Sequence, residues 1–181
     1  MDLGRRIVVV GVTGSGKTTV AKRLSQILHL PHVELDSLYW NANWTSTPKD
    51  IFRQRVADAL CGEAWVTDGN YSVARPILWG QANTLVWLDY PLPVILWQLT
   101  QRTLRRIITN EELWNGNRET WKGAFFDKDA LFPFAVRSHT HHRREYPETF
   151  RKPEYEHLKI IHLKSRQETQ QWLNTLTKNG G

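Results

Sequence analysis

The sequence is poor in cysteine and has no long apolar run. Among its 181 residues Cys61 is the only cysteine, so a disulfide bridge within the chain is excluded and a reducing compartment fits. Because Cys61 follows Leu60 in a helical pattern, we expect it to be a buried apolar side chain. The basic N-terminus continues through a short apolar stretch into a glycine-rich loop, which fits neither a secretory signal nor a membrane span. We therefore expect a soluble cytoplasmic protein.

Several recognition motifs are also missing. The chain has no N-K-x-D string for reading guanine, which disfavours a GTPase switch, and no helix-turn-helix, zinc-finger or RNA-reading motif. Its net charge of +6 suits an anionic partner, and a nucleotide, a nucleic acid and an acidic membrane surface all qualify. The histidines of "HTHH", residues 139–142, are too closely spaced for a metal site, and a basic surface patch explains them more simply.

The most informative stretch that is present is "GVTGSGKTT", residues 11–19. It satisfies the full G-x-x-x-x-G-K-[ST] pattern, and it lies between a strand-like run and an amphipathic helical pattern. Backbone N–H groups in such a loop converge on phosphates, Lys17 reaches the β- and γ-phosphates, and Thr18 supplies an oxygen ligand to Mg²⁺. The residues predicted to bind ATP are Gly11, Thr13, Gly14, Ser15, Gly16, Lys17, Thr18 and Thr19.

Short apolar runs alternate with helix-length segments along the whole chain, which is typical of a parallel sheet covered by helices on both faces. We predict one domain over residues 1–181 with a three-layer α/β/α architecture. The expected strands cover residues 5–10, 32–36, 64–68, 84–89 and 157–163. The expected helices cover residues 17–28, a segment capped by Thr47, residues 91–108 and a closing segment that starts with the capping pair Ser165 and Glu168.

Three of these strands end in a carboxylate, at Asp36, Asp68 and Asp89. Ligands of open α/β sheets gather beyond the carboxyl ends of the strands, so these positions are candidates for chemistry. An aspartate at a strand end is also a common turn former or helix cap, and that structural interpretation stays open for each of them. Asp89 is the weaker metal candidate, because Pro91 indicates a loop that enters a helix.

The segments "GVTGSGKTT", "ELDSLYW", "WVTDGNY" and "VWLDYP", in this order, resemble those of P-loop kinases related to the nucleoside monophosphate kinases. The resemblance is closer to the DNA topology modulation proteins, also called adenylate-kinase-like proteins. It implies a five-stranded parallel sheet, an acceptor region at about residues 36–64 and an arginine-bearing lid at about residues 109–136.

The same resemblance assigns roles to several side chains. It implies that Asp68 holds Mg²⁺ through water, and it places Asn70 and Tyr71 near the acceptor. Asp36 matches the carboxylate that receives the acceptor hydroxyl in enzymes similar to shikimate kinase and gluconate kinase. This is a departure from the pattern of strict nucleotide kinases, and a carboxylate there could accept the hydroxyl proton during transfer.

Arginines gather around the expected lid. Arg102, Arg105 and Arg106 lie close together near the end of one predicted helix, and planar guanidinium groups stabilise a phosphoryl group in transfer. The resemblance implies that Arg102 and Arg106 before the lid and Arg137 after it contact phosphate, with Arg118 as a further candidate. The alternative is a solvated basic helix face.

Together these features predict an ATP- and Mg²⁺-dependent phosphotransferase that acts on a small acceptor, whose identity the sequence does not disclose. An alternative function is that of a nucleic-acid-associated protein with a regulatory ATP site, which the basic charge favours and no motif supports.

Overall fold

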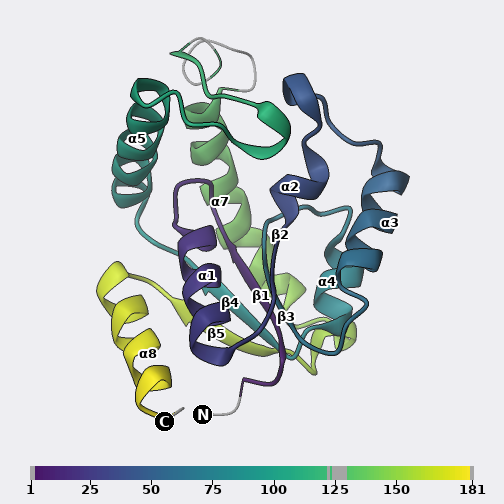
Figure 1. The fold of residues 1–181 in the computed structure, drawn as a ribbon. Coiled ribbons are helices and arrows are strands. Elements are labelled where there is room, and N and C mark those ends of the chain that lie inside the picture. Colours follow the sequence, from purple (N-terminus) through teal and green to yellow (C-terminus); the bar gives the residue numbers. More distant parts are fainter. Residues whose placement is uncertain (1–2, 122, 124–129, 180–181) are drawn as a thin grey trace.

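The computed structural model describes residues 3–121, 123 and 130–179, and these form one parallel β-sheet flanked by helices (Figure 1). The strands are β1 (Arg6–Gly11), β2 (His32–Glu34), β3 (Trp65–Asp68), β4 (Thr84–Leu88) and β5 (Lys159–Leu163). Every neighbouring pair is parallel, and the strands lie in the order β2-β3-β1-β4-β5. The predicted α/β fold with a five-stranded parallel sheet is confirmed.

Helices connect the strands. They are α1 (Lys17–Leu28), α2 (Leu35–Tyr39), α3 (Lys49–Ala59), α4 (Arg75–Gln81), α5 (Leu92–Ile108), α7 (Leu131–Thr149) and α8 (Arg166–Asn179). Three short 3₁₀ turns accompany them, namely η1 (Ala42–Trp44), η2 (Trp114–Gly116) and η3 (Pro153–Tyr155). The closing helix α8 starts as predicted, with the Ser165 hydroxyl accepting a hydrogen bond of 3.1 Å from the Glu168 N–H.

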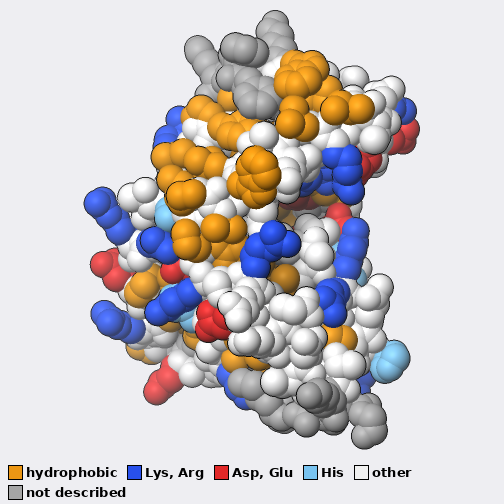
Figure 2. Space-filling view, turned by 90° about the vertical axis from the view of Figure 1, so that its left-hand side faces the viewer, with side chains coloured by type: hydrophobic (Ala, Val, Ile, Leu, Met, Phe, Trp, Pro, Cys, Tyr) orange, Lys and Arg blue, Asp and Glu red, His pale blue; other side chains and the backbone are white. Residues whose placement is uncertain are grey.

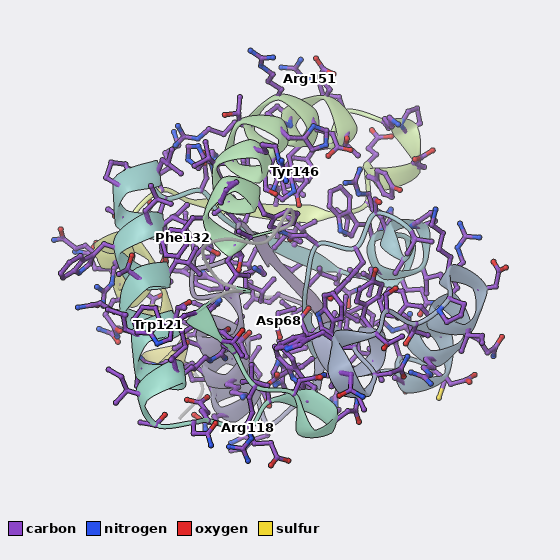
Figure 3. The ribbon with its side chains drawn as sticks, turned by 90° about the horizontal axis from the view of Figure 1, so that it is seen from above. Asp68, Arg118, Trp121, Phe132, Tyr146 and Arg151 are labelled. Atoms are coloured by element: carbon purple, nitrogen blue, oxygen red, sulfur yellow. The ribbon has the colours of Figure 1, made fainter. Side chains whose placement is uncertain are left out.

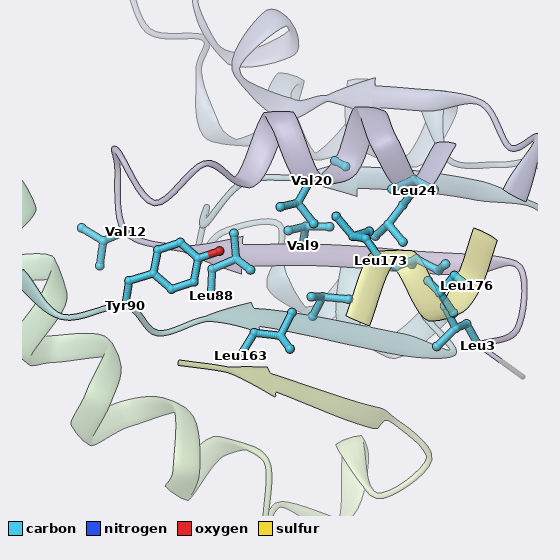
Figure 4. Packing of buried hydrophobic residues seen from close by; sticks show 14 of the residues in the cluster. Leu3, Val9, Val12, Val20, Leu24, Leu88, Tyr90, Leu163, Leu173 and Leu176 are labelled. Carbon is cyan, nitrogen blue, oxygen red and sulfur yellow. The ribbon is translucent and has the colours of Figure 1, made fainter. Parts of the chain in front are cut away.

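The central strand β1 is buried on both faces, because successive side chains of a strand point to opposite sides. Ile7 and Val9 pack with residues of α1, α5 and α8 (Figure 4). Val8 and Val10 pack on the other face with residues of α3, α4 and α7. The sheet is therefore the middle of three layers. Within the described residues no helix has the length and apolar composition that a membrane span requires.

Three local expectations are corrected by the structure. Strand β2 ends at Glu34, so Asp36 lies in the first turn of α2 and not at a strand end. The Thr47 hydroxyl donates to the Tyr39 carbonyl at 2.8 Å and does not cap α3, which begins only at Lys49. Cys61 follows the end of α3 and is exposed rather than buried.

The expected lid at about residues 109–136 is described in part. Residues 122 and 124–129 lie outside the described residues, and its last part belongs to α7. The described part before them contains η2 and an isolated antiparallel bridge between Glu112 and Arg118. A hairpin-like turn thus connects α5 to the segment that leads to α7.

Candidate active site

One cavity of about 1950 Å³ opens at the carboxyl ends of the central strands. Its lining comes from the glycine-rich loop and α1, from α2 and η1, from the segment after β3, and from α5, η2, α7 and α8. In the view from above, Asp68 lies near the centre of the molecule and Arg118 lies at the rim (Figure 3). Figure 2 shows basic side chains beside a hollow in the face that it displays. The sheet thus brings residues far apart in sequence to one site.

The glycine-rich loop joins β1 to the N-terminus of α1. Gly11, Gly14 and Gly16 have backbone φ values of 152°, 83° and 90°, which residues other than glycine rarely adopt. A Cβ atom on Gly14 would lie 2.9 Å from Leu99 Cβ, so the loop also packs too tightly against α5 for a larger residue. Of the residues predicted to bind ATP, all except Gly11 line the cavity. The loop and the helix N-terminus form a cradle suited to phosphates.

Lys17 supplies positive charge at this cradle. Its Nζ atom donates a hydrogen bond of 3.1 Å to the Val12 carbonyl. Burial lowers the pKa of Lys17, while the charges of Asp36 and Asp68 act in the opposite direction. A bound polyphosphate would favour the protonated lysine in the same way as these two carboxylates do.

Thr18 and Asp68 form the part of the site that fits a magnesium ion. The Thr18 hydroxyl donates to Asp68 Oδ2 at 2.7 Å, and His32 Nε2 lies 2.8 Å from Asp68 Oδ1. No group of three or more His, Cys, Asp or Glu side chains in the described part of the chain could hold a metal alone. Mg²⁺ at nucleotide sites keeps several waters and takes few protein oxygens, so one hydroxyl and one carboxylate fit this ion.

The segment after β3 is tied to the phosphate loop. The Gly11 N–H donates to Asn70 Oδ1 at 3.1 Å, and Asn70 Nδ2 donates back to the Gly11 carbonyl. Gly69 has a φ of 147°, and a Cβ atom there would lie 2.9 Å from Leu35 Cδ1. The "DGNY" segment thus holds the start of the phosphate loop in register with α2, a role that the sequence did not reveal.

Asp36, on α2, lines the same cavity as the phosphate loop, and its charge interacts with that of Lys17. The Tyr71 hydroxyl donates to Asp36 Oδ1 at 2.5 Å, which leaves Oδ2 available for another donor. Burial raises the pKa of Asp36, although the hydrogen bond from Tyr71 and the charge of Lys17 oppose the rise. A buried carboxylate with a raised pKa is a better proton acceptor than an exposed one.

Arg102 and Arg106 project from α5 toward the same region. Glu119 Oε1 lies 2.8 Å from an Arg106 nitrogen and 3.7 Å from an Arg102 nitrogen, so two guanidinium groups share one carboxylate. Both Nε atoms are buried and have no hydrogen-bond partner among the described residues, although Arg106 Nε lies 3.5 Å from Glu111 Oε1. Burial and the charge of Arg106 lower the pKa of Arg102. An anion at this position would relieve the repulsion and satisfy the free N–H groups.

Polar contacts connect the turn closed by the bridge between Glu112 and Arg118, which we call the lid turn, to η1. Asn117 Oδ1 accepts a hydrogen bond of 2.7 Å from the Trp44 N–H, and Asn117 Nδ2 donates to the Asn41 carbonyl at 2.8 Å. The Trp114 indole N–H donates to Glu34 Oε2 at 2.9 Å. Lys22 lies 2.5 Å from the other oxygen of Glu34, so that carboxylate connects the lid to α1. Nothing in the sequence pattern indicated these contacts.

Other residues predicted to function lie apart from the cavity or are already engaged. Arg137 is exposed on α7 and does not line the cavity, so the structure does not bring it to the phosphate site. Arg118 lines the cavity, but its guanidinium binds Glu112 at 3.1 Å and the Asn110 carbonyl. Asp89 binds Arg143 at 2.6 Å instead of facing the loop.

The histidine run is not a surface patch. His139 and His142 are buried. His141 is exposed on α7, and its Nε2 atom lies 3.1 Å from Glu145 Oε2. The His142 ring stacks on Tyr146 with centroids 4.6 Å apart, and it lines the cavity. Burial, and after it the charge of Lys17, lower the pKa of His142 to about 4. His142 is therefore a neutral wall of the site at pH 7.

Comparisons with known proteins give a consistent picture. The family model described as shikimate kinase matches residues 13–61. A shikimate kinase of Synechococcus elongatus is 31% identical over 142 residues, which are 67% of this chain and 75% of that protein. The chloroplastic shikimate kinase 1 of Arabidopsis thaliana is 35% identical over 107 residues, 51% of this chain and 35% of that protein.

Solved structures support the fold. A shikimate kinase from Acinetobacter baumannii in complex with shikimate superposes with a TM-score of 0.56 at 16% identity, covering 97% of this chain and 94% of that chain. A gluconokinase from Sinorhizobium meliloti superposes with a TM-score of 0.54 at 17% identity, covering 99% and 97%. These findings support a P-loop kinase and give no support to the finer resemblance to DNA topology modulation proteins.

Proposed function

Because this chain belongs to the shikimate kinase family and is an ATP-dependent kinase, we propose that it transfers the γ-phosphoryl group of ATP to a hydroxyl group of a small ring-shaped acceptor. The observation that carries this proposal is the place of Asp36. Its carboxylate lines the same cavity as the phosphate loop, and its charge interacts with those of Lys17 and Asp68. A proton acceptor therefore faces the position of the reacting phosphate.

The proposed reaction uses the two oxygens of Asp36 differently. Tyr71 holds Oδ1, and Oδ2 accepts the hydrogen bond of the acceptor hydroxyl. As the acceptor oxygen forms its bond to the γ-phosphorus, the bond from that phosphorus to the β–γ bridging oxygen breaks and ADP leaves. The hydroxyl proton passes to Asp36, whose raised pKa favours this transfer.

Positive side chains surround the transferred group in this proposal. Lys17 binds the β- and γ-phosphates from the loop, and Arg102 and Arg106 approach from α5, where Glu119 contacts both guanidinium groups and Glu111 contacts Arg106. Transfer of a phosphoryl group depends mainly on positioning and on neutralising charge, so these three cations supply most of the stabilisation. The N–H groups of the loop fix the phosphates in line with Asp36.

Thr18 and Asp68 are the residues that would hold Mg²⁺, Thr18 directly and Asp68 through water. The ion, when bound, neutralises charge on the phosphate oxygens. The hydrogen bond of 2.7 Å between the two side chains aligns their oxygens before binding. His32, 2.8 Å from Asp68, keeps that carboxylate oriented.

Release of ADP tests the proposal. The protein is incubated with ATP and Mg²⁺ and a panel of acceptors: shikimate first, because the relatives are named for it, then sugar acids, nucleosides and nucleoside monophosphates. The Lys17→Ala variant is the blank. Release that an acceptor stimulates above the blank supports a kinase with that class of substrate. Release that stays at the blank level with every hydroxyl acceptor contradicts the proposal. The similar proteins reported above are kinases, so they lend no support to the nucleic-acid alternative.

A further inference from the structure

The half of the cavity that faces the phosphate loop is lined by aromatic rings. Tyr39, Trp40, Trp44, Tyr71 and, from the lid turn, Trp114 all line it, and together we call them the aromatic wall. Four of these rings are in contact: the Tyr39 centroid lies 4.5 Å from Tyr71 and 4.9 Å from Trp40, and Trp40 lies 5.5 Å from Trp44. The wall thus offers a continuous apolar surface rather than isolated side chains.

The charges on this side of the cavity are negative. Asp36 lies beside the wall, and Glu34 lines the cavity two residues earlier. Lys22, 2.5 Å away, neutralises Glu34. Within the described residues the Tyr71 hydroxyl is the one hydrogen-bond donor to the Asp36 carboxylate, and the cations that act on it, Lys17 and Arg102, are those that face the transferred phosphate.

The basic residues that could bind an anionic acceptor are directed elsewhere. Between residues 36 and 64 the chain has three of them, Lys49, Arg53 and Arg55, and none of the three lines the cavity. Arg53 Nε donates to the Val73 carbonyl at 3.1 Å. Arg55 Nη1 lies within 3.2 Å of three oxygens, namely the Leu38 carbonyl, Asn41 Oδ1 and the Thr47 hydroxyl. In the lid, the guanidinium of Arg118 is bound to the lid itself.

From these contacts we propose that the aromatic wall binds an acceptor ring that carries no negative charge, and that it disfavours a carboxylate-bearing ring such as shikimate. This inference rests on the proposed function for the phosphate transfer, but the binding preference follows from the wall alone. A carboxylate placed against the wall would lose hydration, would compete with Glu112 for the Arg118 guanidinium and would approach Asp36. An uncharged ring would lose little and would stack on Tyr39 or Trp40.

Binding distinguishes the two classes with closely matched ligands. Shikimate and its methyl ester share the ring and the three hydroxyl groups and differ in the negative charge. Uridine adds a planar uncharged ring with sugar hydroxyls. Calorimetry with the full chain, saturated with Mg²⁺ and a non-hydrolysable ATP analogue, measures the three dissociation constants. We expect the ester, or uridine, to bind at least about tenfold more tightly than shikimate. If neither uncharged compound binds more tightly than shikimate, the inference is overturned.

Variants of the wall give a second readout. Trp40→Leu should weaken binding of the preferred uncharged ligand about tenfold, and Trp40→Phe should restore most of the loss, because stacking needs a ring and not an indole. Trp97, which is 61% exposed on α5 and outside the cavity, gives the matched control Trp97→Leu, which should bind like the wild type. Thermal unfolding verifies that each variant is folded. Equal affinity of Trp40→Leu and wild type would overturn the inference.

The two proposals fail in different ways. If the uncharged ligands bind and depend on Trp40, but no acceptor releases ADP above the Lys17→Ala blank, the binding inference stands and the kinase proposal falls. If shikimate binds at least as tightly as both uncharged compounds and is phosphorylated, the kinase proposal stands and the inference about the wall falls.

Discussion

The two ends of the cavity are built in different ways. The phosphate cradle of the donor end comes from one uninterrupted stretch, residues 11–19, in which glycine conformation, Lys17 and Thr18 act together, and α5 adds Arg102 and Arg106 to it. The acceptor end is assembled from α2, η1, the segment after β3 and the lid turn, which are held together by contacts such as that between Trp114 and Glu34. The chemistry of phosphate binding is therefore local in sequence, while acceptor binding depends on tertiary packing.

The charges at the two ends differ as well. Lys17, Arg102 and Arg106 bring positive charge to the phosphates, and Glu119 balances only part of it. The acceptor end has Asp36 and rings. Substitutions at the donor end should therefore remove turnover, whereas those at the acceptor end should change which compound is bound and how well.

The largest effect is expected at Lys17. Lys17→Ala should lower turnover about 10³-fold, because a charge that stabilises the transition state is lost. ADP release measures turnover, and thermal unfolding verifies the fold. Lys49→Ala, at an exposed lysine outside the cavity, is the control and should behave like wild type. An unfolded Lys17→Ala protein, or one with wild-type turnover, would contradict the role of this lysine.

His142 tests the electrostatics of the donor end through stability. Its pKa of about 4 in the folded protein is below the ordinary 6.5, so the folded state binds fewer protons and loses stability as the pH falls from 6.5 through 4. When the pH falls from 7 to 4, this group should lower the free energy of unfolding by about 3 kcal/mol. Urea unfolding at both pH values measures this decrease. His142→Phe keeps a ring stacked on Tyr146, and its free energy of unfolding should fall by about 3 kcal/mol less than that of the wild type.

The exposed neighbour His141 provides the control for this measurement. His141→Gln replaces the neighbouring ring, whose side chain is 67% exposed, and its unfolding is measured at the same two pH values. If His142→Phe and wild type lose equal stability between the two pH values, His142 is not the neutral wall described here.

Asp36 tests the junction between the two ends. Asp36→Asn should lower turnover on a hydroxyl acceptor about 10²-fold and leave ATP affinity nearly unchanged, because only the proton acceptor is removed. Tyr71→Phe keeps the carboxylate but loses the hydrogen bond of 2.5 Å, and turnover should fall only about tenfold. ADP release and ATP titration measure the two effects. Equal losses of turnover and ATP affinity in Asp36→Asn would assign Asp36 a structural role.

The contrast between the two ends also explains how far the sequence predicts this protein. The phosphate loop, the parallel sheet and the closing helix follow from local patterns, which are read directly from periodicity and caps. The proximity of Asp68 to Thr18 follows from the fold class. The pairing of Trp114 with Glu34 and the contact of Asn70 with Gly11 join residues 80 and 59 positions apart, and no local pattern specifies such partners.

Arg137 does not line the cavity for a related reason. The direction in which a basic residue on a predicted helix points is set only when the helix packs, and the buried side of α7 is formed by Ala135, His139, His142 and Tyr146. Position 137 lies off that side and faces solvent. The resemblance could indicate that an arginine follows the lid, but the packing of α7 decides which positions face the cavity.

The smallest expected effect concerns the contact that closes the acceptor end. Trp114→Phe keeps a ring in the aromatic wall but removes the indole N–H that binds Glu34 at 2.9 Å. Acceptor KM should rise severalfold while ATP KM stays constant. Glu34 also binds Lys22, so Glu34→Gln alone would mix two effects. A double-mutant cycle of Trp114→Phe and Glu34→Gln, followed through acceptor kcat/KM, isolates the pair, and we expect a coupling energy of about 1 kcal/mol. Strict additivity would mean that acceptor binding does not depend on the contact between Trp114 and Glu34.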